Sequence, residues 1–169
     1  MKRKILLTLL AILVIIQFIR PARNLSDQLS TNDLTRHYTV PQDVQEILQR
    51  SCNDCHSNNT RYPWYNNIQP VAWWLNHHVD EGKEELNFDE FATYAAARKY
   101  DKIKETKKEV DEGEMPIYSY TLVHAEARLT DAEKQALTSW SENIRKQMEA
   151  SYPKDSLERK RGPEPPDGD

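Results

Sequence analysis

The stretch Cys52-Asn53-Asp54-Cys55-His56 contains both cysteines of this 169-residue chain. Cys-x-x-Cys-His spacing is typical of covalent c-type haem attachment. Two thiols one short turn apart reach the two vinyl groups on one porphyrin edge, and the adjacent imidazole binds the iron from one face. We therefore expect one covalent haem c, with Cys52 and Cys55 as its thioether attachments and His56 as the proximal iron ligand.

Two other interpretations of the cysteine pair are open. A redox dithiol or a disulfide also uses Cys-x-x-Cys, but thioredoxin-like sites need a strand–turn–helix context that the sequence does not show. A zinc site made of Cys52, Cys55 and the His77-His78 pair lacks the usual ligand spacing and leaves His56 without a role. The haem interpretation is favoured because it uses all three residues of the motif.

The second axial ligand is expected downstream of the motif, where two methionines occur. Met148 falls on an apolar helical stripe and is expected in the core. Met115 lies between Gly113 and Pro116 in an expected loop, from which a thioether reaches iron, so it is predicted as the sixth ligand. His124 is the main alternative. Further rivals are His77 and His78.

An aromatic run from Arg61 to Tyr65 follows the motif directly, and Trp73-Trp74 comes soon after it. A haem needs flat apolar walls, and Trp N–H or Tyr O–H groups bond its propionates. Trp64 and Tyr65 are therefore candidate pocket residues, and Arg61 is a candidate partner of a propionate. Ordinary core aromatics are nearly as good an interpretation of this run.

Hydrophobic periodicity and capping residues predict helices throughout the central part of the chain. The expected helices cover about residues 41–52, 70–78, 87–100, a polar stretch to Val110 that ends at Gly113, and 130–148. The last of them begins with Thr130-Asp131-Ala132-Glu133, which is a capping box. No segment alternates with period two, so the expected fold class is all-α, with small helices around one haem.

The N-terminus has the pattern of an export signal. Residues 2–4 are basic, and residues 5–19 are apolar apart from Thr8 and Gln17. No Ala-x-Ala cleavage site follows, and no cysteine is present for lipoprotein processing. Residues 1–23 are therefore expected to be an uncleaved signal anchor, a single-pass helix in the cell inner membrane with the rest of the chain on the periplasmic side.

The rest of the chain divides by composition into three parts. Residues 24–39 are polar and are expected to be a linker. Residues 40–150 are expected to be the haem-binding domain, which is small for an unaided hydrophobic core. Residues 151–169 are rich in proline, glycine and charge, so we expect a disordered tail.

Composition excludes several other classes of function. The four glycines are far apart in the sequence, so no glycine-rich phosphate loop is present. The first 23 residues carry five basic and no acidic side chains, which leaves 18 basic and 27 acidic residues in the remainder. This acidic balance argues against a nucleic-acid partner and indicates a protein partner with a basic surface.

Five stretches of the sequence resemble the bacterial haem-binding domain family of small c-type cytochromes. They are residues 52–65, 70–79, 86–88, Met115-Pro116 and the helix start at 129–133. The resemblance covers about residues 40–145, and its N-terminal half is the more specific part. It implies a small cytochrome c-like helical domain with one covalent haem, membrane attachment in the periplasm and a redox partner protein.

The first expected helix departs from ordinary small cytochromes c. That fold has a glycine in its first helix, which lets the last helix cross closely, and residues 43–50 contain none. The Leu137-x-x-Trp140 pair does match the last helix of that fold. The resemblance therefore implies the haem ligands but not the detailed helix crossing.

The expected function is one-electron transfer by an iron-containing electron carrier rather than catalysis. A His/Met ligand pair raises the reduction potential of haem iron. The alternative is a haem sensor or small-ligand binder with a labile sixth ligand. A peroxidase is disfavoured because no distal acid–base pair is evident.

Overall fold

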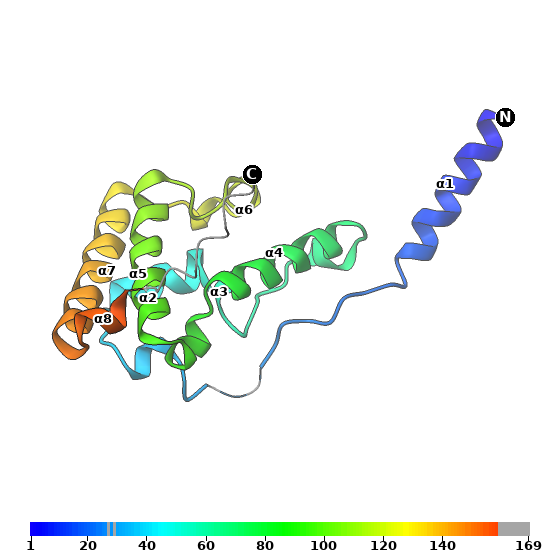
Figure 1. The fold of residues 1–169 in the computed structure, drawn as a ribbon. Helices are drawn as coiled ribbons and strands as arrows, with labels where there is room; N and C mark the ends of the chain where they lie inside the picture. Colours follow the sequence, from blue (N-terminus) through cyan, green and yellow to red (C-terminus); the bar gives the residue numbers. More distant parts are fainter. Residues whose placement is uncertain (27, 29, 159–169) are drawn as a thin grey trace, which may run out of the picture.

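The computed structural model describes residues 1–26, 28 and 30–158, and every regular element in these ranges is a helix (Figure 1). The α-helices are α1 (Lys2–Ile16), α2 (Gln42–Ser51), α3 (Asn53–His56), α4 (Val71–Glu85), α5 (Ala96–Glu112), α6 (Tyr118–Val123), α7 (Asp131–Ser151) and α8 (Lys154–Leu157). The 3₁₀ helices are η1 (Leu34–Arg36), η2 (Trp64–Asn67), η3 (Phe88–Thr93) and η4 (Ala125–Ala127). The all-α expectation is confirmed.

The core lies between α2, α5 and α7, with α5 and α7 in extensive contact side by side (Figure 1). Apolar residues repeat at helical spacing on the facing sides of these helices, so each contributes one buried stripe. The buried members are Val44, Ile47 and Leu48 of α2, Ile103 and Val110 of α5, and Leu137, Trp140, Ile144 and Met148 of α7. Met148 is thus a core residue, as its place on the stripe predicts.

The ends of α5 and α7 follow from local sequence. At the start of α7, the Thr130 hydroxyl accepts a hydrogen bond from the Glu133 backbone N–H at 3.3 Å. The Glu133 carboxylate accepts one from the Thr130 N–H at 2.8 Å, which completes the predicted capping box. Gly113 ends α5 with a φ of +78°, a left-handed conformation that glycine adopts without strain.

The expected continuous helix over 87–100 is wrong. This segment forms η3, then an extended pair at Tyr94 and Ala95, and only then α5. The break coincides with a hydrogen bond inside the segment, which the Tyr94 hydroxyl accepts from the Asn87 N–H at 2.9 Å. Further departures are the extension of α4 to Glu85 and several short helices that were not expected, among them α6 and α8.

Both flanks of the central domain pack on it. Leu34, within the expected linker 24–39, is only 1% exposed and belongs to the core, because η1 places it there. Within the expected disordered tail 151–169, α8 buries Leu157 against the core. Residues 159–169 lie outside the described part of the chain.

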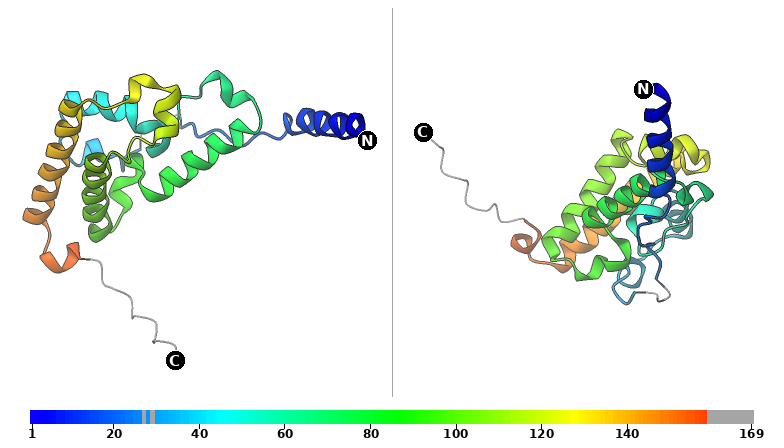
Figure 2. Two further views of the ribbon diagram at one scale, coloured as in Figure 1. Left: turned by 90° about the horizontal axis from the view of Figure 1, so that it is seen from above. Right: turned by 90° about the vertical axis from the view of Figure 1, so that its right-hand side faces the viewer.

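Helix α1 projects away from the rest of the chain and lies beyond the N-terminal end of α4 (Figures 1 and 2). It is 15 residues long, and none of its residues is buried. A search of the described residues finds no helix with the length and apolar character needed to cross a membrane.

Candidate functional site

The two cysteines and His56 lie on one turn of chain at the junction of α2 and α3. The Cys52 N–H still donates to the Leu48 carbonyl at 2.9 Å, which completes α2. The N–H groups of Cys55 and His56 then both donate to the Cys52 carbonyl, at 3.1 and 3.0 Å. This turn brings both thiols and the imidazole to one end of α2.

Helix α4 crosses this turn at very short range. A Cβ atom at Gly82 would lie 2.7 Å from the Cys55 carbonyl oxygen and 2.9 Å from its Cβ. Such distances exclude any larger residue without a backbone shift. The close helix crossing of this domain is therefore made by Gly82 of α4. The glycine that α2 lacks is thus found in a different helix.

The His56 ring is held by the chain segment that follows α4. Its Nδ1 lies 2.8 Å from the Leu86 carbonyl oxygen, and its ring contacts Phe88 edge-on at 6.2 Å between centroids. A carbonyl only accepts, so Nδ1 carries the proton and Nε2 keeps a free lone pair. Burial lowers the pKa of His56, which favours the neutral imidazole that binds metal.

A cavity of about 430 Å³ opens beside the motif, between α3, α4, α5 and the loop that follows α5. Cys52, Cys55 and His56 all line it, and so does Met115. Its apolar walls are Leu86, Phe88, Val110, Ile117 and Leu129. A neutral imidazole, a thioether and two thiols around an apolar cavity are the donor set and the surroundings that a haem requires.

The chemistry of the thiols disfavours the dithiol interpretation. Cys52 and Cys55 are free thiols. Burial raises the pKa of Cys52 to about 12 and that of Cys55 to about 11, with the neighbouring Cys55 and Asp54 charges adding to these shifts. Reactive dithiols need a lowered pKa. As for the zinc interpretation, no group of three His, Cys, Asp or Glu side chains suited to a metal ion occurs in the described ranges.

The structure leaves two of the four candidates for the second axial ligand on the cavity of His56. Met115 is 37% exposed, on the loop that continues from α5, and lines the same cavity as His56. His78 on α4 also lines this cavity, whereas the His77 side chain is 66% exposed and contacts Glu81. His124 lines a different, adjoining cavity of about 400 Å³.

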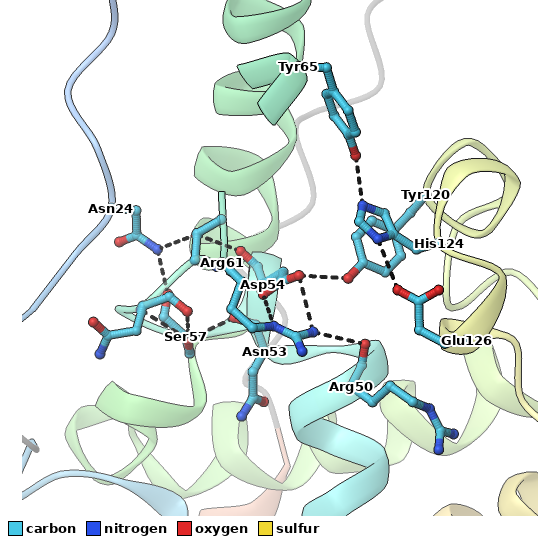
Figure 3. A network of polar contacts seen from close by, with 12 residues as sticks. Asn24, Arg50, Asn53, Asp54, Ser57, Arg61, Tyr65, Tyr120, His124 and Glu126 are labelled. Carbon is cyan, nitrogen blue, oxygen red and sulfur yellow. Dashed lines mark hydrogen bonds and ion pairs between the residues drawn. The ribbon is translucent and has the colours of Figure 1, made fainter. Parts of the chain in front are cut away.

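The side chain of Asp54, between the two cysteines, is buried and accepts hydrogen bonds from two directions (Figure 3). The backbone N–H and Nε of Arg61 donate to its Oδ1 at 3.1 and 3.0 Å. The Tyr120 hydroxyl on α6 donates to its Oδ2 at 2.7 Å. Burial, followed by this hydrogen bond to Asp54, raises the pKa of Tyr120. Asp54 therefore ties the motif to α6.

Arg61, a candidate for a propionate, has Asp54 as its ion-pair partner and also donates to the Arg50 carbonyl at 3.2 Å. The hydrogen bond to Asp54 is the main cause that raises the pKa of Arg61. Arg61 lines the adjoining cavity rather than the one beside His56. The sequence did not mark Asp54 as a site residue, because its partners Arg61 and Tyr120 are brought to it by the fold.

A second part of the polar network joins the aromatic run to α6 (Figure 3). The Tyr65 hydroxyl lies 2.7 Å from His124 Nε2, and the other His124 ring nitrogen lies 3.2 Å from Glu126. The His124 ring stacks on Tyr120, with 4.5 Å between the centroids. His124 is thus already held by three neighbours. Trp64 is 76% exposed and lines neither cavity.

Comparison with known proteins identifies the family of the chain. No curated protein and no solved structure matches it. The profile described as "Haem-binding domain" matches residues 11–143, which is most of the chain and includes every residue of the site described above. The chain belongs to the haem-binding domain family.

Proposed function

We propose that the chain carries one haem c and transfers single electrons. Cys52 and Cys55 would hold the haem as thioethers, and His56 Nε2 and the Met115 sulfur would bind its iron. The observation that supports this most directly is that these four side chains line one apolar cavity. The bound haem supplies the one-electron chemistry of iron.

The residues of the chain have distinct parts in this function. The Leu86 carbonyl holds the His56 proton on Nδ1 and so orients the ring. The apolar walls keep water from the iron, and a methionine ligand favours the ferrous state. No acid–base step is needed, so the chain acts as a carrier and not as an enzyme.

We further propose that the domain works outside the cytoplasmic membrane. Residues 1–23 attach it to the inner membrane, since α1 is apolar from Ile5 onward apart from Thr8, and none of its residues is buried. An export signal also fits covalent haem attachment, because that reaction joins the two thiols to haem outside the cytosol. The surplus of acidic residues after residue 23 suits a redox partner protein with a basic surface.

The experiment is expression of the full chain in a host that matures c-type cytochromes, followed by denaturation. Wild type is expected to keep its haem on the denatured chain, whereas the double variant Cys52→Ala/Cys55→Ala is expected to lose it. An Asn53→Ala variant, which changes the same turn without removing a thiol, is the matched control. Release of all haem from the denatured wild type would contradict covalent attachment.

The exposure of Met115 favours a haem-based ligand sensor as the second candidate function. A weakly held loop methionine is displaced by an added ligand, whereas a firmly held one is not. Carbon monoxide added to the reduced protein distinguishes the two. Slow or absent binding supports electron transfer, and rapid stoichiometric binding supports the sensor.

A further inference from the structure

Five apolar side chains are exposed in the segment where η2 leads into the first turns of α4. We call Trp64, Ile68, Val71, Trp73 and Trp74 the tip surface. Their exposed fractions run from 36% for Val71 to 76% for Trp64, and Val71 and Trp74 also line the cavity of His124. A short segment that exposes three tryptophans is typical of a surface that contacts another phase or a partner.

The chain that leaves α1 is hydrogen-bonded to this same tip. The Gln69 N–H donates to the Gln17 side-chain oxygen at 2.9 Å. The Ile19 carbonyl accepts from the Gln69 side chain at 2.8 Å and from the Trp73 indole N–H at 3.0 Å. These bonds join residues 50 to 54 positions apart in the sequence, so the position of the α1 exit relative to the tip is defined.

The direction of α1 leaves the tip surface uncovered. Figure 2 shows α1 continuing outward from the end of α4 at which the tip surface lies. No residue of α1 is buried, so its apolar side chains do not pack on the tip. Phe18 and Ile19, just beyond α1, are 84% and 56% exposed beside it. Two uncovered apolar surfaces thus adjoin each other.

Charge separates this end from the rest of an acidic chain. Residues 1–26 and 61–79 contain no Asp or Glu, although the chain has 27 acidic residues. Arg20 and Arg23 both donate to the Asn67 side chain, at 3.4 and 3.3 Å, which places two guanidinium groups at the edge of the tip. Cations and tryptophans at the end of an apolar helix are the side chains found at a lipid headgroup layer.

We propose that the tip surface docks in the interface of an anionic lipid bilayer, with Arg20 and Arg23 at the headgroups and α1 in the apolar layer. This rests on the membrane attachment proposed above. Helix α4 then acts as a spacer, because the nine residue steps from Trp73 to Gly82 give about 13.5 Å of axial rise. The haem cavity is held at a set height above the lipid surface.

The test uses Trp64 as the reporter, because its indole makes no hydrogen bond that the docking would need. Full-length holoprotein is reconstituted in vesicles of phosphatidylcholine and phosphatidylglycerol with either brominated or plain acyl chains. The Trp64 signal is the difference in emission between wild type and Trp64→Phe, so Trp73 and Trp74 stay in place in both proteins. The matched control is the difference between wild type and Trp140→Phe, because Trp140 is 3% exposed in the core.

The Trp64 signal is expected to be lower in brominated than in plain vesicles, because bromine on the acyl chains quenches an indole that lies in the bilayer interface. The Trp140 signal is expected to be equal in both, and quenching by haem cancels because only vesicle pairs are compared. The Trp64 signal does not require Trp140→Phe, so the test does not depend on the folding of that variant. Equal Trp64 emission in both vesicle types would overturn the docking.

Flotation of the same samples separates this inference from the attachment on which it rests. Chains that float with the vesicles but show no Trp64 quenching keep the attachment and refute the docking. Chains that do not float refute both. Quenching that persists unchanged in pure phosphatidylcholine would overturn the part assigned to Arg20 and Arg23.

Discussion

The Nδ1 atom of His56 lies 2.8 Å from the carbonyl oxygen of Leu86, the residue that ends α4. Leu86 is itself fixed, because its N–H donates to the Gly82 carbonyl at 2.9 Å. The same helix end therefore orients the imidazole and, through Gly82, contacts Cys55. The haem motif and the C-terminal end of α4 form one structural unit.

Substitution of Met115 distinguishes it from His124 as the sixth ligand. Met115→Ala is expected to remove the methionine-to-iron signature from the ferric absorption spectrum, to lower the reduction potential and to allow rapid carbon monoxide binding. His124→Ala is expected to keep the wild-type spectrum, because His124 lies on the adjoining cavity and is bonded to Tyr65. The reverse pattern of spectra would contradict the assignment of Met115.

Loss of the Asp54 charge is expected to destabilise the fold. Asp54→Asn keeps the shape of the side chain but weakens its bonds to Arg61 and Tyr120, so the free energy of unfolding should fall by about 1–3 kcal/mol. Urea denaturation followed by circular dichroism measures it. Asp111→Asn, which removes an exposed ion pair with Lys107, is the control and should change stability by less than about 0.5 kcal/mol. Equal effects of the two substitutions would argue against a stabilising network at Asp54.

A single methyl group at Gly82 is expected to disturb the haem site. In Gly82→Ala the new Cβ lies within 3 Å of two Cys55 atoms, so α4 and α3 must separate, at a cost of about 1–3 kcal/mol. The yield of haem-loaded chain is expected to fall together with the stability of the fold. Glu84→Ala, at an exposed position on the same helix, is the control and should match wild type in both respects. Wild-type stability in Gly82→Ala would mean that the two helices are not in close contact.

The capping box of α7 predicts a pH dependence. Hydrogen bonds from the Thr130 N–H and then from Arg50 lower the pKa of Glu133 below its ordinary value of 4.5. A carboxyl whose pKa is lower in the folded than in the unfolded state stabilises the fold above the unfolded pKa and loses that contribution as the pH falls through the folded one. The free energy of unfolding of wild type should therefore exceed that of Glu133→Gln by about 0.5–1 kcal/mol at pH 7. This difference should decrease as the pH falls below about 4.5.

Urea titrations of both proteins at pH 7 and at pH 3.5 measure that gap. Ser139→Ala, at an exposed position of α7 without a titrating group, should differ from wild type by the same amount at both values. A gap between wild type and Glu133→Gln that does not change with pH would show that the Glu133 charge makes no contribution to the cap.

The sequence by itself determined the features that depend on neighbouring residues. The stripes of α2 and α7 follow from apolar spacing, the start of α7 from Thr130 and Glu133, and the end of α5 from Gly113. The motif at 52–56 indicated the cofactor in the same way, because its spacing reflects the geometry of a porphyrin edge. These signals are local, so they can be recognised before the chain is folded.

Only the tertiary structure decided which distant groups meet. Arg61 is paired with Asp54, Tyr65 contacts His124, and the segment around Tyr94 breaks a helix that periodicity favoured. Leu34 and Leu157, which composition placed in a linker and a tail, complete the core. The two partners of Asp54, for example, lie 7 and 66 positions from it, at Arg61 and Tyr120. Such partners are determined by packing and by the need of every buried polar group for a hydrogen bond. No local pattern encodes that choice.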